Sequence, residues 1–95
     1  MIKVVARSRV KPDKVSEYKA LAARLVVVTR KDKGCISYSL YQDVHDEFMF
    51  SFIEEWHDGD SLAAHLQSKH FNAIVPLLNE LREGETETHV YREVR

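Results

Sequence analysis

Four stretches of the chain alternate at every second position, which is the period of a β-strand with two distinct faces. They cover residues 2–10, 35–43, 48–56 and 85–95. In the third stretch, Phe52, Glu54 and Trp56 share one face, and the other face carries Met49 and Ile53. A strand with apolar residues on both faces is typical of the centre of a sheet. The alternation therefore predicts four strands, with the third in a central position.

Three further stretches carry apolar residues every three or four positions, which is the period of an amphipathic helix. The first runs from Asp13, its expected cap, to a basic turn before Gly34. The second is short and follows a polar turn at residues 57–61. The third begins at a further cap, Ser68, and contains Pro76, where the missing N–H predicts a kink or a break.

The order of these elements is βαββααβ, the split βαβ arrangement of a ferredoxin-like α+β domain with a four-stranded antiparallel sheet. Ninety-five residues make one domain, spanning 1–95, with enough chain to bury a modest core. Helices cover only one face of such a sheet. The opposite face still carries apolar residues, namely Val5, Met49, Ile53 and Tyr91. Because an exposed apolar face is typical of an interface, we expect a homodimer through this sheet face.

The charges are balanced and spread along the chain, with 14 basic and 15 acidic residues and a net charge of −1 at pH 7. A nucleic-acid partner would require a basic surface, so none is expected. The longest aliphatic run, residues 25–28, is far too short to span a membrane, and no signal peptide is evident. The single cysteine, Cys35, cannot form an internal disulfide, so we expect a reducing, cytoplasmic location.

Glu54 is the most unusual residue of the third strand because Phe52 and Trp56 flank it on the same face. A carboxyl group in such surroundings needs a hydrogen bond or has a raised pKa. His65 lies at the apolar edge of the short helix, and it would approach Trp56 if that helix folds back over the sheet. Together these residues predict a small-molecule pocket with apolar walls, lined by Trp56 and His65.

Structural roles are the alternatives for the same residues. Glu54 would then bridge to Arg7 or another base and only hold the fold, and His65 would be a hydrogen-bonded core or rim residue. The aromatic residues before Trp56 on this strand face are Phe48, Phe50 and Phe52. Most of them are expected to be ordinary residues of the hydrophobic core. Glu54 and Glu55 point to opposite faces of a strand, so they cannot form a glycosidase pair.

The spacing of the possible ligands predicts no metal site. The five histidines lie at positions 45, 57, 65, 70 and 89, without i, i+4 or H-x-H spacing, and Cys35 has no second cysteine at zinc-type spacing. The three glycines are isolated from one another, so no phosphate-binding loop is expected. The sequence predicts neither a metal nor a nucleotide cofactor.

A set of motif residues occurs in order along the chain: Gly34-Cys35, Tyr38, Glu54-x-Trp56, His65 and Ser68-x-His70. This pattern, with the order of elements over nearly the whole chain, resembles the antibiotic biosynthesis monooxygenase family, which includes cofactor-free quinol monooxygenases. The resemblance implies a dimeric α+β barrel, no cofactor, and functional positions at Trp56, His65 and His70. Haem-degrading relatives carry Asn and His where this chain has Ser8 and Val75, so haem degradation is not expected.

The activity that the resemblance implies is cofactor-independent oxidation of a small aromatic phenol or quinol by dioxygen. Such a reaction needs a substrate that supplies its own electrons, a base and a dry cavity. The expected catalytic set is His65 as the base, since imidazole titrates near neutral pH, with Trp56 and Glu54. The residues expected to hold the substrate are Phe52, Phe71, His70 and Tyr38. The alternatives on this fold are a small-metabolite isomerase and a non-catalytic ligand-binding dimer.

Overall fold

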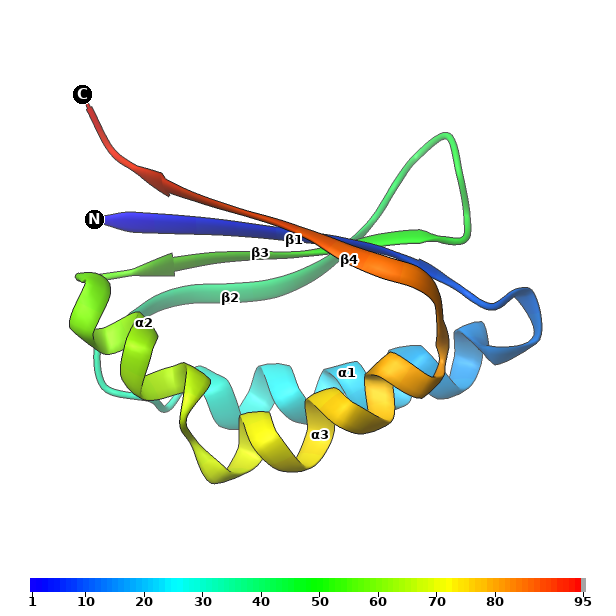
Figure 1. Cartoon of the computed structure of the whole chain (residues 1–95), viewed down its shortest axis with the longest axis horizontal. Helices are drawn as coiled ribbons and strands as arrows, with labels where there is room; N and C mark the ends of the chain where they lie inside the picture. The colour runs from blue at the N-terminus through cyan, green and yellow to red at the C-terminus, as the bar shows by residue number, and fades with distance from the viewer. Residues whose placement is uncertain (95) are drawn as a thin grey trace.

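A single sheet with helices on one side makes up the computed structural model, which describes residues 1–94 (Figure 1). The strands are β1 (Ile2–Val10), β2 (Cys35–Gln42), β3 (Met49–Trp56) and β4 (Arg82–Arg92). The helices are α1 (Val15–Thr29), α2 (Gly59–Leu66) and α3 (Lys69–Glu80), with a short 3-10 turn, Pro12–Lys14, before α1. The helices α1 and α3 lie side by side under the sheet, and α2 follows the end of β3 (Figure 1). The predicted ferredoxin-like α+β fold is confirmed.

The strands follow the order β2-β3-β1-β4, and every neighbouring pair is antiparallel. The strand β3 is therefore central, as its two apolar faces predict. Glu54 of β3 pairs with Tyr38 on β2 and with Val4 on β1. Val4 in turn pairs with Val90 on β4. Because residues paired across strands share a face, this row brings one residue from each strand to the same side as Glu54.

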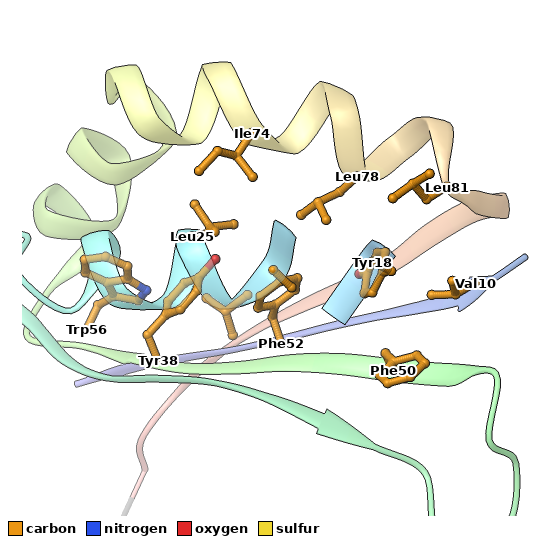
Figure 2. Close-up of a cluster of buried hydrophobic side chains, with 12 residues drawn as sticks. Val10, Tyr18, Leu25, Tyr38, Phe50, Phe52, Trp56, Ile74, Leu78 and Leu81 are labelled. Carbon is orange, nitrogen blue, oxygen red and sulfur yellow. The ribbon is translucent and has the colours of Figure 1, made fainter. Parts of the chain in front are cut away.

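The core lies between the sheet and the helices (Figure 2). Along β3, positions 50, 52, 54 and 56 are buried, whereas the positions between them are only half-buried. The buried aromatic side chains of this strand face Leu25 of α1 and Leu78 of α3, which are also fully buried (Figure 2). Burying an apolar side chain of this size contributes about 1.5–3 kcal/mol. This packing fixes β3, and with it Glu54, against the helical layer.

The helix caps agree in part with the sequence. The predicted cap of α3 is confirmed, since the Phe71 N–H donates to Ser68 Oγ at 3.2 Å. In the polar turn before α2, the Ser61 N–H donates to Asp58 Oδ1 at 2.8 Å, so Asp58 is the cap. Asp13 is not a cap, because it lies inside the 3-10 turn that precedes α1.

The connection from α3 to β4 differs from the prediction. The helix α3 runs unbroken through Pro76, because its apolar residues Ile74 and Leu78 are packed into the core. The pattern also predicts helix up to Gly84, but β4 already begins at Arg82, which pairs with Val10 of β1. Gly84 has a φ of 73° and lies at a register shift, where a bulge favours glycine. The strand ends at Arg92, and the last predicted strand residue, position 95, lies outside the described residues.

The sheet face turned away from the helices is mixed in character. Val5, Met49 and Ile53 are half-buried there, and Tyr91 keeps 53% of its surface exposed. Charged residues lie among them, and Arg7 forms an ion pair with Asp43 at 3.3 Å. No helix among residues 1–94 has the length and apolar character needed to cross a bilayer.

Replacing Gly34 by Ala is expected to destabilise the fold by about 1–3 kcal/mol or more. Gly34 has a φ of 85°, and a Cβ added there would lie 2.0 Å from Ser61 Oγ at the start of α2. Gly84→Ala is the matched control, because Gly84 has a similar φ of 73° but no atom near the added Cβ. Urea unfolding of both variants measures the difference. Equal losses of stability would contradict the close approach of Gly34 and α2.

Candidate functional site

A cavity of about 250 Å³ lies between the sheet and the helices. Its walls are mostly apolar, and they include Glu54, Tyr38 and Arg82 as ionisable groups. The complete lining is Val4, Ala6, Leu25, Tyr38, Phe52, Glu54, Leu62, Leu66, Phe71, Val75, Asn79, Arg82, Thr86, Thr88 and Val90. A small, mainly apolar cavity with a few polar groups is the usual form of a small-molecule site.

Glu54 is a buried carboxyl group that faces this cavity. Only 6% of the surface of Glu54 is exposed, and Trp56 Nε1 donates a hydrogen bond to Glu54 Oε1 at 2.9 Å. Burial raises the pKa of Glu54 to about 7, and the hydrogen bond from Trp56 opposes this shift only in part. The predicted alternative, a bridge from Glu54 to Arg7 or another base, is not seen among residues 1–94, and Arg7 pairs with Asp43. Glu54 can therefore exchange a proton at neutral pH inside an apolar cavity.

Trp56 and His65 lie on the same side of the sheet and pack against each other. Trp56 is fully buried, and its ring centroid lies 4.7 Å from that of His65, with 34° between the planes. Tyr38 and Phe71 pack edge-on against the imidazole, with centroids at 5.4 and 5.0 Å. The indole of Trp56 lies beside Tyr38 at one end of the core (Figure 2).

The prediction that Trp56 and His65 line one cavity is wrong. Neither ring is among the lining residues of the cavity, whose wall includes Glu54, Tyr38 and Phe71, and the two rings pack against each other instead. The reason is that hydrogen bonds hold both rings in the core: the Trp56 N–H donates to Glu54, and His65 Nδ1 lies 3.1 Å from Asp32 Oδ2. Trp56 thus contacts Glu54, a residue of the cavity wall, without lining the cavity itself.

Sequence reasoning missed Asp32, which joins both motif histidines. Asp32 Oδ2 lies 3.1 Å from His65 Nδ1 and 2.8 Å from His70 Nε2. The three possible ligand atoms lie within 4.8 Å of one another, so the cluster could hold a divalent cation. Two imidazole N–H groups donating to one carboxylate also account for this geometry. Asp32 is 33 positions from His65, and no local spacing links them.

The imidazole of His65 is buried. This burial is the main influence on the pKa of His65 and lowers it, although the hydrogen bond that His65 donates to Asp32 opposes the shift. Within the described part of the chain, His65 Nε2 is buried without a hydrogen-bond partner. Ser68 Oγ donates to the His65 carbonyl at 2.7 Å and fixes the turn between α2 and α3. His65 is thus held rigidly beside the cavity.

The remaining predicted substrate-binding residues divide into two groups. Tyr38, Phe52 and Phe71 line the cavity, whereas His70 binds Asp32 outside it. Sequence reasoning did not single out Arg82, which supplies a cation to the cavity from the start of β4. Basic residues are common near helix ends, so the position of Arg82 in the sequence does not indicate that it lines a cavity.

The pH dependence of stability gives a test of the buried carboxyl group. Because the pKa of Glu54 is raised from 4.5 to about 7 in the folded state, the folded chain binds the proton more tightly than the unfolded chain. Stability should therefore fall as pH rises from about 4.5 to 7, by about 3 kcal/mol from this group. Glu54→Gln should remove this contribution. The free energy of unfolding, measured with urea at several pH values, tests this. The same pH dependence in the wild type and the variant would contradict the raised pKa.

The structure is a ferredoxin-like α+β domain with a mainly apolar cavity between its sheet and helices. The chain belongs to the antibiotic biosynthesis monooxygenase family, whose model matches residues 1–77. The Synechocystis protein sll1783 is 34% identical over 91 residues, which cover 96% of this chain and 62% of that protein's length. This chain therefore spans less than two thirds of that relative.

Two solved structures share this fold over nearly the whole chain. A conserved protein from Methanosarcina mazei is 43% identical, with a TM-score of 0.95 over 97% of this chain and 91% of that one. SnoaB from Streptomyces nogalater, described as a cofactor-independent oxygenase, superimposes with a TM-score of 0.88 over 99% of this chain and 93% of its own. Its identity is 18%, so this likeness shows the fold alone.

Proposed function

We propose that the protein is a cofactor-independent monooxygenase that oxidises a small phenol or quinol with dioxygen. The observation that carries the proposal is Glu54, a carboxyl group with a pKa raised to about 7 that lines a mostly apolar cavity. Membership of the antibiotic biosynthesis monooxygenase family supports it.

The reaction begins when Glu54 accepts the proton of a ring hydroxyl, because the phenolate is a better electron donor than the phenol. One electron passes to dioxygen, and the two radicals combine to form a ring peroxide. Loss of water from the peroxide leaves a quinone, and Glu54 returns its proton to the departing hydroxide. One oxygen atom enters the ring and the other leaves as water, so phenol plus dioxygen gives quinone plus water. An apolar cavity keeps solvent away from the intermediates.

We assign the base to Glu54 rather than to His65, because Glu54 lines the cavity and His65 does not. Tyr38, Phe52 and Phe71 would contact the ring, since all three line the cavity. Trp56 positions the carboxyl group through its 2.9 Å hydrogen bond. His65 acts behind Trp56 by holding the indole in place.

We also propose that the protein acts in the cytoplasm as a homodimer through the outer sheet face. Val5, Met49, Ile53 and Tyr91 supply apolar surface on that face, and the single cysteine supports a reducing location. Light scattering at micromolar concentration should give twice the chain mass of 11.0 kDa. A monomer under these conditions would contradict the dimer.

An oxygen-electrode measurement tests the activity. Adding the protein to menadiol or another hydroquinone should speed oxygen uptake, and His65→Ala should lose most of the gain because Trp56 and Glu54 lose their support. An unchanged rate with the wild type across a panel of phenols and hydroquinones would contradict the proposal. Ligand binding without oxygen uptake would instead favour an isomerase or a non-catalytic binding dimer.

A further inference from the structure

Among the described residues, Arg82 places a positive charge without a carboxylate partner in the wall of the cavity, and its guanidinium lies 5.6 Å from the centroid of the Tyr18 ring. Its guanidinium donates to Tyr18 at 3.1 Å through Nη2 and to Asn79 Oδ1 through Nη1, and both acceptors are neutral. The Arg82 Nε–H is buried and has no acceptor among residues 1–94. Within the same residues, no carboxylate lies within 4 Å of the guanidinium. A buried donor and an unbalanced charge are both costly unless a ligand satisfies them.

This charge lies at the opposite end of the site from Glu54. On β1, Glu54 pairs with Val4 and Arg82 pairs with Val10, so their backbones are about 20 Å apart along the strand. The strand β4 starts at the end of the sheet remote from the end of β3 (Figure 1). Both residues nevertheless line the same cavity, which therefore runs along the sheet between them.

The electrostatic effect of both groups reaches Tyr38, which also lines the cavity. The pKa of the Tyr38 hydroxyl is raised above its usual range, mainly by burial. The negative charge of Glu54 adds to this shift, and the positive charge of Arg82 opposes it. The polar lining residues other than Glu54 and Tyr38 come from the end of α3 and from β4, namely Asn79, Arg82, Thr86 and Thr88. The site therefore has an acidic end at Glu54 and a cationic, hydrogen-bonding end at Arg82.

We infer that Arg82 forms an oxyanion subsite, so that the ligand carries a carboxylate or a similar anionic oxygen at the end remote from its reacting hydroxyl. Arginine is suited to this task because its planar group can donate two hydrogen bonds to one carboxylate. A hydroxyl at Glu54 and an anion at Arg82 would also fix the direction in which the ring enters. The inference rests on the proposed function only for the aromatic ring and the hydroxyl that would react at Glu54.

Equilibrium binding without oxygen tests the subsite independently of turnover. Calorimetry compares a hydroquinone that bears a propanoate side chain with the methyl ester of the same compound, which has the same ring but no charge. The wild type should bind the acid about 10- to 100-fold more tightly than the ester. Equal binding, or tighter binding of the ester, would overturn the subsite and leave the proposed function standing. Binding of neither compound would overturn both.

Variants of Arg82 assign the preference to this residue. Arg82→Met keeps an apolar side chain of similar reach and should abolish the preference for the acid, while Arg82→Lys should keep part of it. The matched control is Arg9→Met, since Arg9 pairs with Asp46 at 2.8 Å away from the cavity and should leave the preference unchanged. A preference that persists in Arg82→Met would overturn the inference. Should that variant not fold, the comparison of acid and ester on the wild type remains decisive.

Discussion

Glu54→Gln is expected to lower hydroquinone-dependent oxygen uptake by about 10²- to 10⁴-fold, the usual contribution of a positioned general base. The amide keeps the shape of the side chain and can still accept the hydrogen bond that Trp56 donates to Oε1. It cannot accept the proton of a ring hydroxyl at neutral pH. The fold should therefore survive while the chemical step is lost, which appears as a lower kcat with a KM close to that of the wild type.

Glu55→Gln is the matched control for this change. Glu55 is adjacent on β3 but points to the outer face, where Ser37 Oγ donates to it at 3.1 Å. The same change of charge there should leave the rate within about twofold of the wild type, since surface substitutions away from the site have little effect. Equal losses in both variants, or full activity in Glu54→Gln, would remove Glu54 from the role of base.

Trp56→Ala is expected to destabilise the fold by about 3–5 kcal/mol, the range for truncating a large buried aromatic residue. Trp56 has no exposed surface, packs on His65 at 4.7 Å and lies edge-on to Tyr38 at 6.4 Å. Its removal leaves a cavity behind the site and also leaves the Glu54 carboxyl group without its hydrogen-bond donor. Urea unfolding at pH 5, where Glu54 is mostly protonated, measures the packing loss with the smallest charge effect.

Two further variants separate the causes of that loss. Val27→Ala shortens an apolar side chain of α1 that is 60% exposed and lies away from the proposed dimer face, and we expect a change within about 0.5 kcal/mol. Trp56→Phe keeps most of the packing but removes the N–H, so it should raise the pKa of Glu54 further, because that hydrogen bond lowers it. A loss below about 1 kcal/mol in Trp56→Ala would contradict the close packing of the indole.

Much of the fold could be predicted because it depends on local patterns. The alternation along β3 correctly predicts a central strand with one buried face, and Ser68 correctly predicts the start of α3. The start of β4 could not be predicted in this way. Gly84 is read as a helix stop, but its positive φ serves a bulge inside the strand, and the pairing of Arg82 with Val10 is a long-range contact.

The site could be predicted only where its residues share one element. Glu54 and Trp56 lie two residues apart on β3, and their hydrogen bond follows from that spacing. The position of His65 depends on Asp32, which comes from the turn after α1, so the sequence alone could not show that the imidazole packs behind the cavity. Arg82 reaches the cavity from the far end of the sheet, and only the three-dimensional arrangement reveals it.

The most direct test of a titratable carboxyl group in this cavity is its own titration. Carbon-13 NMR of the side-chain carboxyl of Glu54, assigned by comparison with Glu54→Gln, follows protonation without substrate or oxygen. The structure predicts a midpoint at a pH of about 7, because burial outweighs the hydrogen bond from Trp56. A midpoint near 4.5, the ordinary value for glutamate, would mean that Glu54 is solvated and ionised, and it would contradict the proposed role.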